Sequence, residues 1–138
     1  MFGNAWVAVV FAVAFLVSGL GSAQAEGDPV AGEKVSKKCI ACHSFEADGV
    51  AKLGPHLFAV IGRPVGGLDG YANYSDSYVA LGKGGLLWSE ETLVAYLKDP
   101  KAAIRDWSGD PKAKSKMTFK LPSDEDVANV IAYMATLK

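Results

Sequence analysis

The sequence is poor in residues that hold metals or crosslinks, with only two cysteines and two histidines in 138 residues. It also lacks an excess of positive charge, because 14 basic residues face 15 acidic ones and leave a formal net charge of −1. No internal repeat, low-complexity tract or alternation of basic and aromatic residues is present. These absences argue against nucleic-acid binding, and the length suits one globular domain.

Charged side chains are also absent from residues 1–25. An apolar run from Ala5 to Val17 is followed by small residues up to Ala25, which is the pattern of a secretory signal peptide, although no Lys or Arg precedes the run. The alternative is an uncleaved membrane anchor, which needs about 20 apolar residues. We expect cleavage after Ala25, export to the periplasm and a mature domain of residues 26–138.

After residue 25 the sequence carries helix signals and few strand signals, so we expect an all-α fold. Three capping residues precede apolar positions at helical spacing: Asp28, Ser89 and Ser123. The helices predicted after them run from Pro29 into the cysteines, from Glu90 to just before Pro100, and from Asp124 to Lys138. The stretch from about Ser44 to Leu86 is rich in Gly and Pro and is predicted to be mostly loop.

Both cysteines lie in one short motif, Cys39-Ile40-Ala41-Cys42-His43. A structural zinc site would need a second pair of ligands. A thioredoxin-like dithiol would need a strand before the motif, where this chain is predicted to be helical. A bare disulfide would close a very small loop and leave His43 without a role. The C-x-x-C-H spacing instead indicates covalent haem attachment, in which two thiols add to the vinyl groups and His43 becomes an axial ligand of the iron.

Three residues are candidates for the opposite face of the iron: Met117, Met134 and His56. Met134 lies on the apolar stripe of the last predicted helix, where a core methionine is the simpler interpretation. His56 follows His43 so closely that the intervening loop would hardly pass round the haem edge. Met117 is an isolated thioether among four lysines, far enough along the chain to wrap the cofactor. It is the predicted sixth ligand.

Several segments together resemble a class I cytochrome c, close to the bacterial cytochrome c2 subgroup. In chain order they are CIACH, LGPHLFAVIGR, YANYSDSY, LLWSEETLVAYLKDP, KSKMTFKLP and DVANVIAYMATLK. The resemblance covers essentially the whole of residues 26–138. It implies about three to five helices wrapped around one haem c, which is held by two thioethers and surrounded by Gly/Pro-rich loops.

The resemblance also implies contacts to the axial ligands. The Pro55 carbonyl would accept a hydrogen bond from the second ring nitrogen of His43, which fixes the tautomer and raises the basicity of the ligand. The Tyr96 hydroxyl would touch the sulfur of Met117. Gly32 would let the first helix approach the last one closely.

A haem propionate would be held by three donors that the resemblance implies, Arg63, Tyr74 and Trp88. The segment GYANYS holds one residue more between its aromatics than the family pattern, so Tyr71 is the alternative to Tyr74. Ser115 corresponds to a further propionate donor. The segment RDWSGDPKAK is expected to be an inserted loop before the methionine, and Trp107 within it matches no family role.

An iron with protein ligands on both faces has no open position for a substrate, so we expect one-electron transfer rather than enzyme catalysis, at a potential raised by the thioether. By resemblance, a monomeric carrier would take electrons from a quinol-oxidising cytochrome bc complex. It would pass them to a photosynthetic reaction centre or a terminal oxidase, through transient contacts with these membrane proteins. The alternatives are a small peroxidase or gas binder without Met117 ligation, and a tethered module that retains its leader.

Positive charge gathers near the proposed ligands although the net charge is close to zero. The lysines concerned are Lys37, Lys38, Lys112, Lys114, Lys116 and Lys120. Lysines solvate any loop, but both groups adjoin the haem contacts in sequence. We expect a basic ring around the haem edge that steers docking onto acidic partners, at a rate that falls as salt rises.

Overall fold

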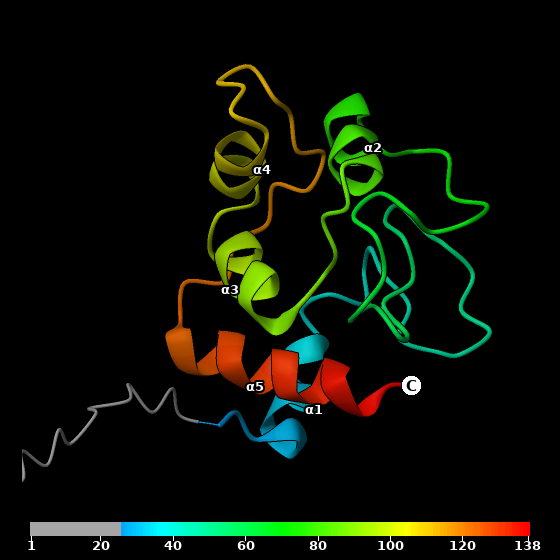
Figure 1. The fold of residues 1–138 in the computed structure, drawn as a ribbon. Coiled ribbons are helices and arrows are strands. Elements are labelled where there is room, and N and C mark those ends of the chain that lie inside the picture. Colours follow the sequence, from blue (N-terminus) through cyan, green and yellow to red (C-terminus); the bar gives the residue numbers. More distant parts are fainter. Residues whose placement is uncertain (1–25) are drawn as a thin grey trace, which may run out of the picture.

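The computed structural model describes residues 26–138, and the predicted signal peptide lies outside the described residues. The described part folds into five α-helices without a β-sheet (Figure 1). The helices are α1 (Pro29–Ser36), α2 (Asp76–Lys83), α3 (Glu90–Lys98), α4 (Pro100–Ser108) and α5 (Asp124–Thr136). The all-α prediction is confirmed. Over residues 26–138, no helix combines the length and the apolar character that a membrane crossing requires.

Helices α1 and α5 pack against each other at the bottom of the view in Figure 1. The approach is close because Gly32 on α1 has no Cβ. An added Cβ would lie 1.9 Å from the carbonyl oxygen of Asn129 and 2.9 Å from the Cβ of Tyr133. The start of α1 is fixed to α5 as well, since the Asp28 backbone N–H donates to the Asn129 side chain at 2.7 Å. The close crossing expected at Gly32 is present.

Side-chain caps set the helix starts where the sequence predicted them. Three caps accept a backbone N–H two or three residues ahead: Asp28, Ser89 and Ser123. The reciprocal capping box forms at Ser89, whose backbone N–H donates to the Thr92 hydroxyl at 2.7 Å. Helix α1 ends at Ser36 and gives way to turns before the cysteines, and α5 ends at Thr136. Both helices are therefore shorter than predicted.

Helix α4 contradicts the loop expected before Met117. Pro100 follows the end of α3 as predicted, but it is also the first residue of α4, where a missing N–H costs no hydrogen bond. Asp99 caps this second helix, accepting the Ala102 N–H at 3.0 Å. Residues 105–108 are thus helical, and the loop begins at Gly109, whose φ of 65° lies in the left-handed region.

The stretch from about Ser44 to Leu86 is mostly loop, as predicted, but it also contains helix α2, which the sequence did not predict. Helix α2 was not predicted because it contains Gly82, and glycine normally weakens a helix. Here the glycine serves packing, since a Cβ on Gly82 would lie 1.9 Å from the carbonyl oxygen of Val65. Helix α2 buries Tyr78, which later proves part of the site.

Two apolar clusters form the core of the described residues. The first joins α1, α3 and α5 through residues such as Val35, Leu93 and Val130. The second joins α2, α3 and α4 through residues such as Tyr78, Tyr96 and Ile104. Trp88 and Met117 are partly buried and pack against both clusters. They therefore mark the region where the two halves of the core meet.

Candidate cofactor site

A cavity of about 540 Å³ opens between the two clusters, within the range of about 300–1,000 Å³ usual for small-molecule sites. Its wall combines the C-x-x-C-H motif, the loops after it, α2, α3, α5 and the segment around Met117. The predicted site residues that line it are Cys39, Cys42, His43, Pro55, Arg63, Tyr71, Tyr74, Trp88, Tyr96 and Met117. The fold thus gathers side chains that are far apart in sequence around one space.

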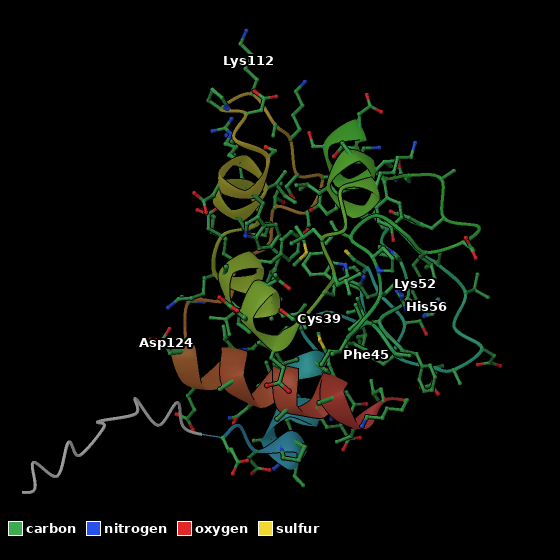
Figure 2. The ribbon with its side chains drawn as sticks, viewed as in Figure 1. Cys39, Phe45, Lys52, His56, Lys112 and Asp124 are labelled. Atoms are coloured by element: carbon green, nitrogen blue, oxygen red, sulfur yellow. The ribbon has the colours of Figure 1, made fainter. Side chains whose placement is uncertain are left out.

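The C-x-x-C-H motif follows α1 in a run of turns. The backbone N–H groups of Cys42 and His43 both donate to the Cys39 carbonyl, at 3.1 and 2.9 Å. This folds the motif so that Cys39, Cys42 and His43 all border the cavity. Both thiols are free and half-buried, and burial raises the pKa of Cys39 against the opposing charge of Lys38. Figure 2 places Cys39 just above α5, in the middle of the molecule.

The Pro55 carbonyl fixes the orientation of the His43 imidazole. Its Nδ1 lies 2.7 Å from the Pro55 carbonyl oxygen, so Nδ1 donates and Nε2 keeps its lone pair for a metal. Burial lowers the pKa of His43, while the Pro55 carbonyl raises it and the charge of Lys52 lowers it, so the ring favours its neutral, ligating form. Gly54 leaves room for the ring, because a Cβ there would lie 2.4 Å from His43 Cε1. This arrangement fits a haem axial ligand.

Replacing Gly54 by Ala should loosen this arrangement, because the new Cβ would also lie 2.7 Å from His43 Nδ1 and push the ring off Pro55. We expect protons to detach His43 more easily, raising the midpoint of the acid spectral transition by about one pH unit, at the lower end of the 10–100-fold effects of such partners. The measurement is an acid titration followed by visible absorption. Gly84→Ala, at an ordinary φ of −75° away from the cavity, is the control and should titrate like the parent. An unchanged midpoint in Gly54→Ala would contradict this account.

Arg63 and Trp88 lie side by side on two short extended segments. The backbone N–H of Trp88 donates to the Arg63 carbonyl at 2.9 Å, and Pro64 and Leu87 form an isolated antiparallel bridge. The guanidinium of Arg63 also donates to the His56 carbonyl at 2.8 Å and to the Phe58 carbonyl at 2.5 Å. Its charge is thereby held at the cavity wall beside an indole, where a propionate could accept hydrogen bonds from both.

Tyr71 and Tyr74 both line the cavity and pack edge to face, with ring centroids 4.7 Å apart. The Tyr71 hydroxyl is already engaged, since it donates to the Leu53 carbonyl at 2.6 Å. Burial raises the pKa of Tyr74, and the nearby charge of Arg63 lowers it. The site therefore leaves Tyr74 as the phenol next to the guanidinium, which favours it over Tyr71 as a propionate donor.

Met117 is anchored through its backbone to a chain of buried hydroxyls. The Ser115 hydroxyl donates to the Met117 carbonyl at 2.8 Å and lies 2.8 Å from the Tyr78 hydroxyl. Tyr78 in turn is hydrogen-bonded to Tyr96. Burial raises the pKa of Tyr96 far above its ordinary range. Ser115 thus contributes to holding the methionine segment, and its hydroxyl is not placed on the cavity wall as a propionate donor would be.

Two functional residues escaped the sequence interpretation. Tyr78 lines the cavity from α2, a helix that was not predicted. Lys52 lies close enough to lower the pKa of His43, and it donates to the Ile40 carbonyl at 2.9 Å across the motif. No local sequence motif marks either residue. The link between Tyr78 and Tyr96 is a hydrogen bond between their hydroxyls, which depends on how the fold places α2 relative to α3.

The rival ligands occupy different places. Met134 also lines the cavity, but it is 2% exposed and packs with α5 into the first cluster. His56 lies beyond the cavity wall, in the loop at the right of Figure 2, with a buried Nδ1 that has no partner. Among the residues described, no group of three or more His, Cys, Asp or Glu side chains could hold a bare metal ion.

Comparisons with known proteins identify the family of the chain. The family model for Cytochrome c matches residues 29–138. Cytochrome c2 of Rhodospirillum rubrum is 56% identical over 129 residues, which is 94% of this chain and 93% of the relative. Cytochrome c-550 of Novispirillum itersonii is 46% identical over 112 residues, 81% of this chain and 100% of the relative. The solved structure of cytochrome c2 from Rhodospirillum centenum has a TM-score of 0.76 at 41% identity, covering 80% of this chain and 98% of that one.

The chain belongs to the cytochrome c family, within its class I cytochrome c2 subgroup. The resemblance read from the sequence is thereby confirmed, and so is the class I fold. Members of the family bind haem c covalently, and Cys39 and Cys42 have the spacing this attachment requires. Haem c is therefore the cofactor of this chain.

Proposed function

We propose that this protein is a one-electron carrier of the periplasm whose haem iron is ligated by His43 and Met117. The observation that carries the proposal is the placement of the C-x-x-C-H motif, the imidazole bonded to Pro55 and a thioether around one cavity. The bound haem c supplies the exchange between ferric and ferrous iron. The chain supplies two ligands and an apolar wall, which leave no open position for a substrate.

The choice of Met117 over Met134 rests on their surroundings. Met134 belongs to the first cluster, the same cluster against which Cys39 packs. Met117 packs against both clusters, and its carbonyl is connected through Ser115 to the hydroxyls of Tyr78 and Tyr96. A haem attached on the Cys39 side needs its sixth ligand from the other side, and Met117 is the thioether that reaches the second cluster.

The propionates would lie toward Arg63, Tyr74 and Trp88. These three side chains share one stretch of cavity wall, with the positive charge held by backbone carbonyls. Hydrogen bonds to an ionised carboxylate are about twice as strong as neutral ones. We assign these residues to holding the cofactor in register, and Tyr96 to contact with the ligating sulfur.

Export is supported by the length of a relative. A second cytochrome c2 sequence from Rhodospirillum rubrum aligns over 113 residues, which are 100% of its own length and 82% of this chain. That length equals the part of the chain from residue 26 to residue 138. We propose that residues 1–25 are removed after Ala25. Sequencing the N-terminus of the mature protein tests this, and a start at Met1 would overturn it.

We propose that the carrier, as a monomer, docks transiently through the mouth of the cavity. Lys38 and Lys116 border the cavity, and two apolar side chains at its edge, Leu53 and Phe119, are 71% and 42% exposed. Basic charge around an exposed apolar centre suits short-lived complexes with acidic partners. The partners we propose are a cytochrome bc complex as donor and a reaction centre or terminal oxidase as acceptor.

The lysines of the proposed ring differ in whether a nearby acidic side chain pairs with their charge. Lys38 pairs with Asp126 at 2.7 Å and Lys120 with Asp99 at 2.6 Å. Lys116 donates to the neutral side chain of Asn73 at 2.7 Å and keeps its charge. Lys112 lies at the far top of the molecule in Figure 2, away from the cavity region that Cys39 marks. Of the six lysines in the proposed ring, Lys38 and Lys116 are the two that line the cavity, and only Lys38 of these is paired with an acid. Lys116 should therefore dominate the steering of partners.

Reversing the charge at Lys116 should slow electron delivery from membranes that contain a cytochrome bc complex and quinol. We expect Lys116→Glu to lower the second-order rate by about tenfold at low ionic strength, at the lower end of steering effects, with an unchanged visible spectrum. The difference should fade near 1 M salt, where the Debye length is about 3 Å. Lys112→Glu makes the same change in net charge at the far end of the molecule and should have a much smaller effect. Equal rates for both variants at every salt concentration would argue against docking at the cavity mouth.

The donor assignment has its own test. Wild-type protein should be reduced rapidly by such membranes when quinol is present, and this reduction should stop when the bc complex is inhibited. Protein that accepts electrons from dithionite but not from these membranes would refute the proposed donor. That result would leave the proposed one-electron transfer by the haem unaffected.

A further inference from the structure

A row of aromatic rings joins the cavity wall to the surface of α4. Trp88 and Tyr96 both line the cavity, and their ring centroids are 4.8 Å apart. The ring of Trp107 lies 6.1 Å from Trp88 and 6.4 Å from Tyr96, and it is nearly parallel to the latter at 18°. All three separations fall within the range of direct aromatic contact. The π-systems therefore form an unbroken path from the haem cavity to Trp107.

Trp107 is the outer end of this path. It is half-buried in the last turn of α4 and is not part of the cavity wall. It borders an open hollow of about 700 Å³ on the other side of the second cluster, together with Ala95 and Ala103. Over residues 26–138, the one buried side-chain polar atom without a partner is His56 Nδ1, so the Trp107 N–H is not sealed in the core.

The phenol and indole side chains of this row differ in how readily they lose an electron together with a proton. A phenol gives up an electron readily only when a base takes its proton. The Tyr96 hydroxyl is followed by those of Tyr78 and Ser115, and the chain ends on the Met117 carbonyl, which is not a base. An indole can lose an electron first, and the N–H of Trp107 meets water, which takes the proton. Trp88, the other indole of the row, lines the cavity that the haem fills, whereas Trp107 borders the open hollow. An electron vacancy that reaches Trp107 can therefore be filled by a reductant in solution.

We propose that Trp107 is the exit for an oxidising equivalent when a hydroperoxide displaces Met117 and reacts with the haem. Reduction of one hydroperoxide to an alcohol and water consumes two electrons and two protons. The bound haem would supply one of these electrons, and Trp107 would supply the other through Trp88 or Tyr96. The indole N–H gives one proton and the solvent the other. A thiol or ascorbate-type reductant would then return one electron to the haem and one hydrogen atom to the neutral indolyl radical. Without such a reductant, the indolyl radical combines with dioxygen to give an oxygenated ring.

This role protects the cavity, because oxidative damage occurs at Trp107 on α4 and not at the residues that line the haem cavity. The inference depends on the haem site described above and not on the proposed docking partners. A purely structural Trp107 would instead matter for packing alone, since it fills space between α3 and α4 against Trp88 and Tyr96.

The experiment treats the ferric holoprotein with excess hydrogen peroxide in air, without reductant, and maps added oxygen by peptide mass spectrometry. In the wild type we expect the modification at Trp107 before Trp88 or Tyr96. In Trp107→Phe we expect modification of Trp88 or Tyr96 and haem bleaching several-fold faster. The matched control is the double variant Asp106→Trp/Trp107→Phe, which moves the indole to a neighbouring exposed position of α4. The moved indole should stay unmodified, and bleaching should remain fast.

Three results would overturn the proposal. The first is a wild-type map with oxygen on Trp88 or Tyr96 and none on Trp107. The second is equal modification of the indole at positions 106 and 107, which means direct attack from solution. The third is the same bleaching rate in wild type and Trp107→Phe, which leaves a packing role only. The wild-type map decides by itself if the variants do not fold, and the visible spectrum before peroxide reports on the electron-carrier site separately.

Discussion

Met117→Ala should lose the far-red sulfur-to-iron absorption of the oxidised protein and should bind carbon monoxide when reduced. Met117 is the one cavity thioether that reaches the second cluster, so its removal opens the iron on that side. A thioether favours ferrous iron. We therefore expect the reduction potential to fall by on the order of 0.2–0.3 V, within the range of about 0.8 V that axial ligands cover.

The matched control for this change is Met134→Leu. Met134 also lines the cavity, but it is buried with α5, and a substitution that conserves volume in a core usually costs less than about 1.5 kcal/mol. Its spectrum and potential should match those of the wild type. Loss of the far-red band in Met134→Leu, with the band kept in Met117→Ala, would exchange the roles of the two methionines.

Gly32→Ala should destabilise the protein although alanine favours helix. A Cβ at Gly32 would lie 1.9 Å from the carbonyl oxygen of Asn129 and 2.5 Å from its carbonyl carbon. These are backbone atoms of α5, so the two helices must move apart. Overpacking of this kind costs about 1–3 kcal/mol, occasionally more. It outweighs the gain of up to about 1 kcal/mol from helix propensity.

The measurement is the free energy of unfolding of the ferric holoprotein in denaturant. Gly84→Ala is the control, because its nearest neighbour would be the Leu81 carbonyl oxygen at 3.3 Å and its φ is −75°. We expect a change below about 1 kcal/mol for this control. Stability of Gly32→Ala equal to that of the wild type would mean that the α1–α5 crossing is looser than the structure has it.

The sequence predicted the ends of the domain better than its middle. Helices α1 and α5 carry side-chain caps at Asp28 and Ser123 and bury one face each. Their apolar spacing therefore predicted both helices. Helix α2 was not predicted, because it contains Gly82, whose reason for being there is contact with Val65 far away in sequence. Helix α4 was hidden by Pro100, since a proline can end one helix and begin the next.

The site divides in the same way. The C-x-x-C-H motif is local, so its chemistry was legible from spacing, and the family supplied Pro55, which the structure places 2.7 Å from His43. The roles of Tyr78 and Trp107 were not legible, because both depend on ring contacts between α2, α3 and α4. Such contacts follow from tertiary packing and leave no local signal.

The most direct test of the central claim, a haem c held between His43 and Met117, is the visible spectrum of the purified protein. It should be recorded oxidised, reduced with dithionite, and reduced with carbon monoxide added. We predict a sharp c-type reduced spectrum, a weak far-red band when oxidised and no change with carbon monoxide. A missing far-red band together with ready binding of carbon monoxide would mean an open iron, and it would contradict the assignment of this protein as an electron carrier with two protein ligands.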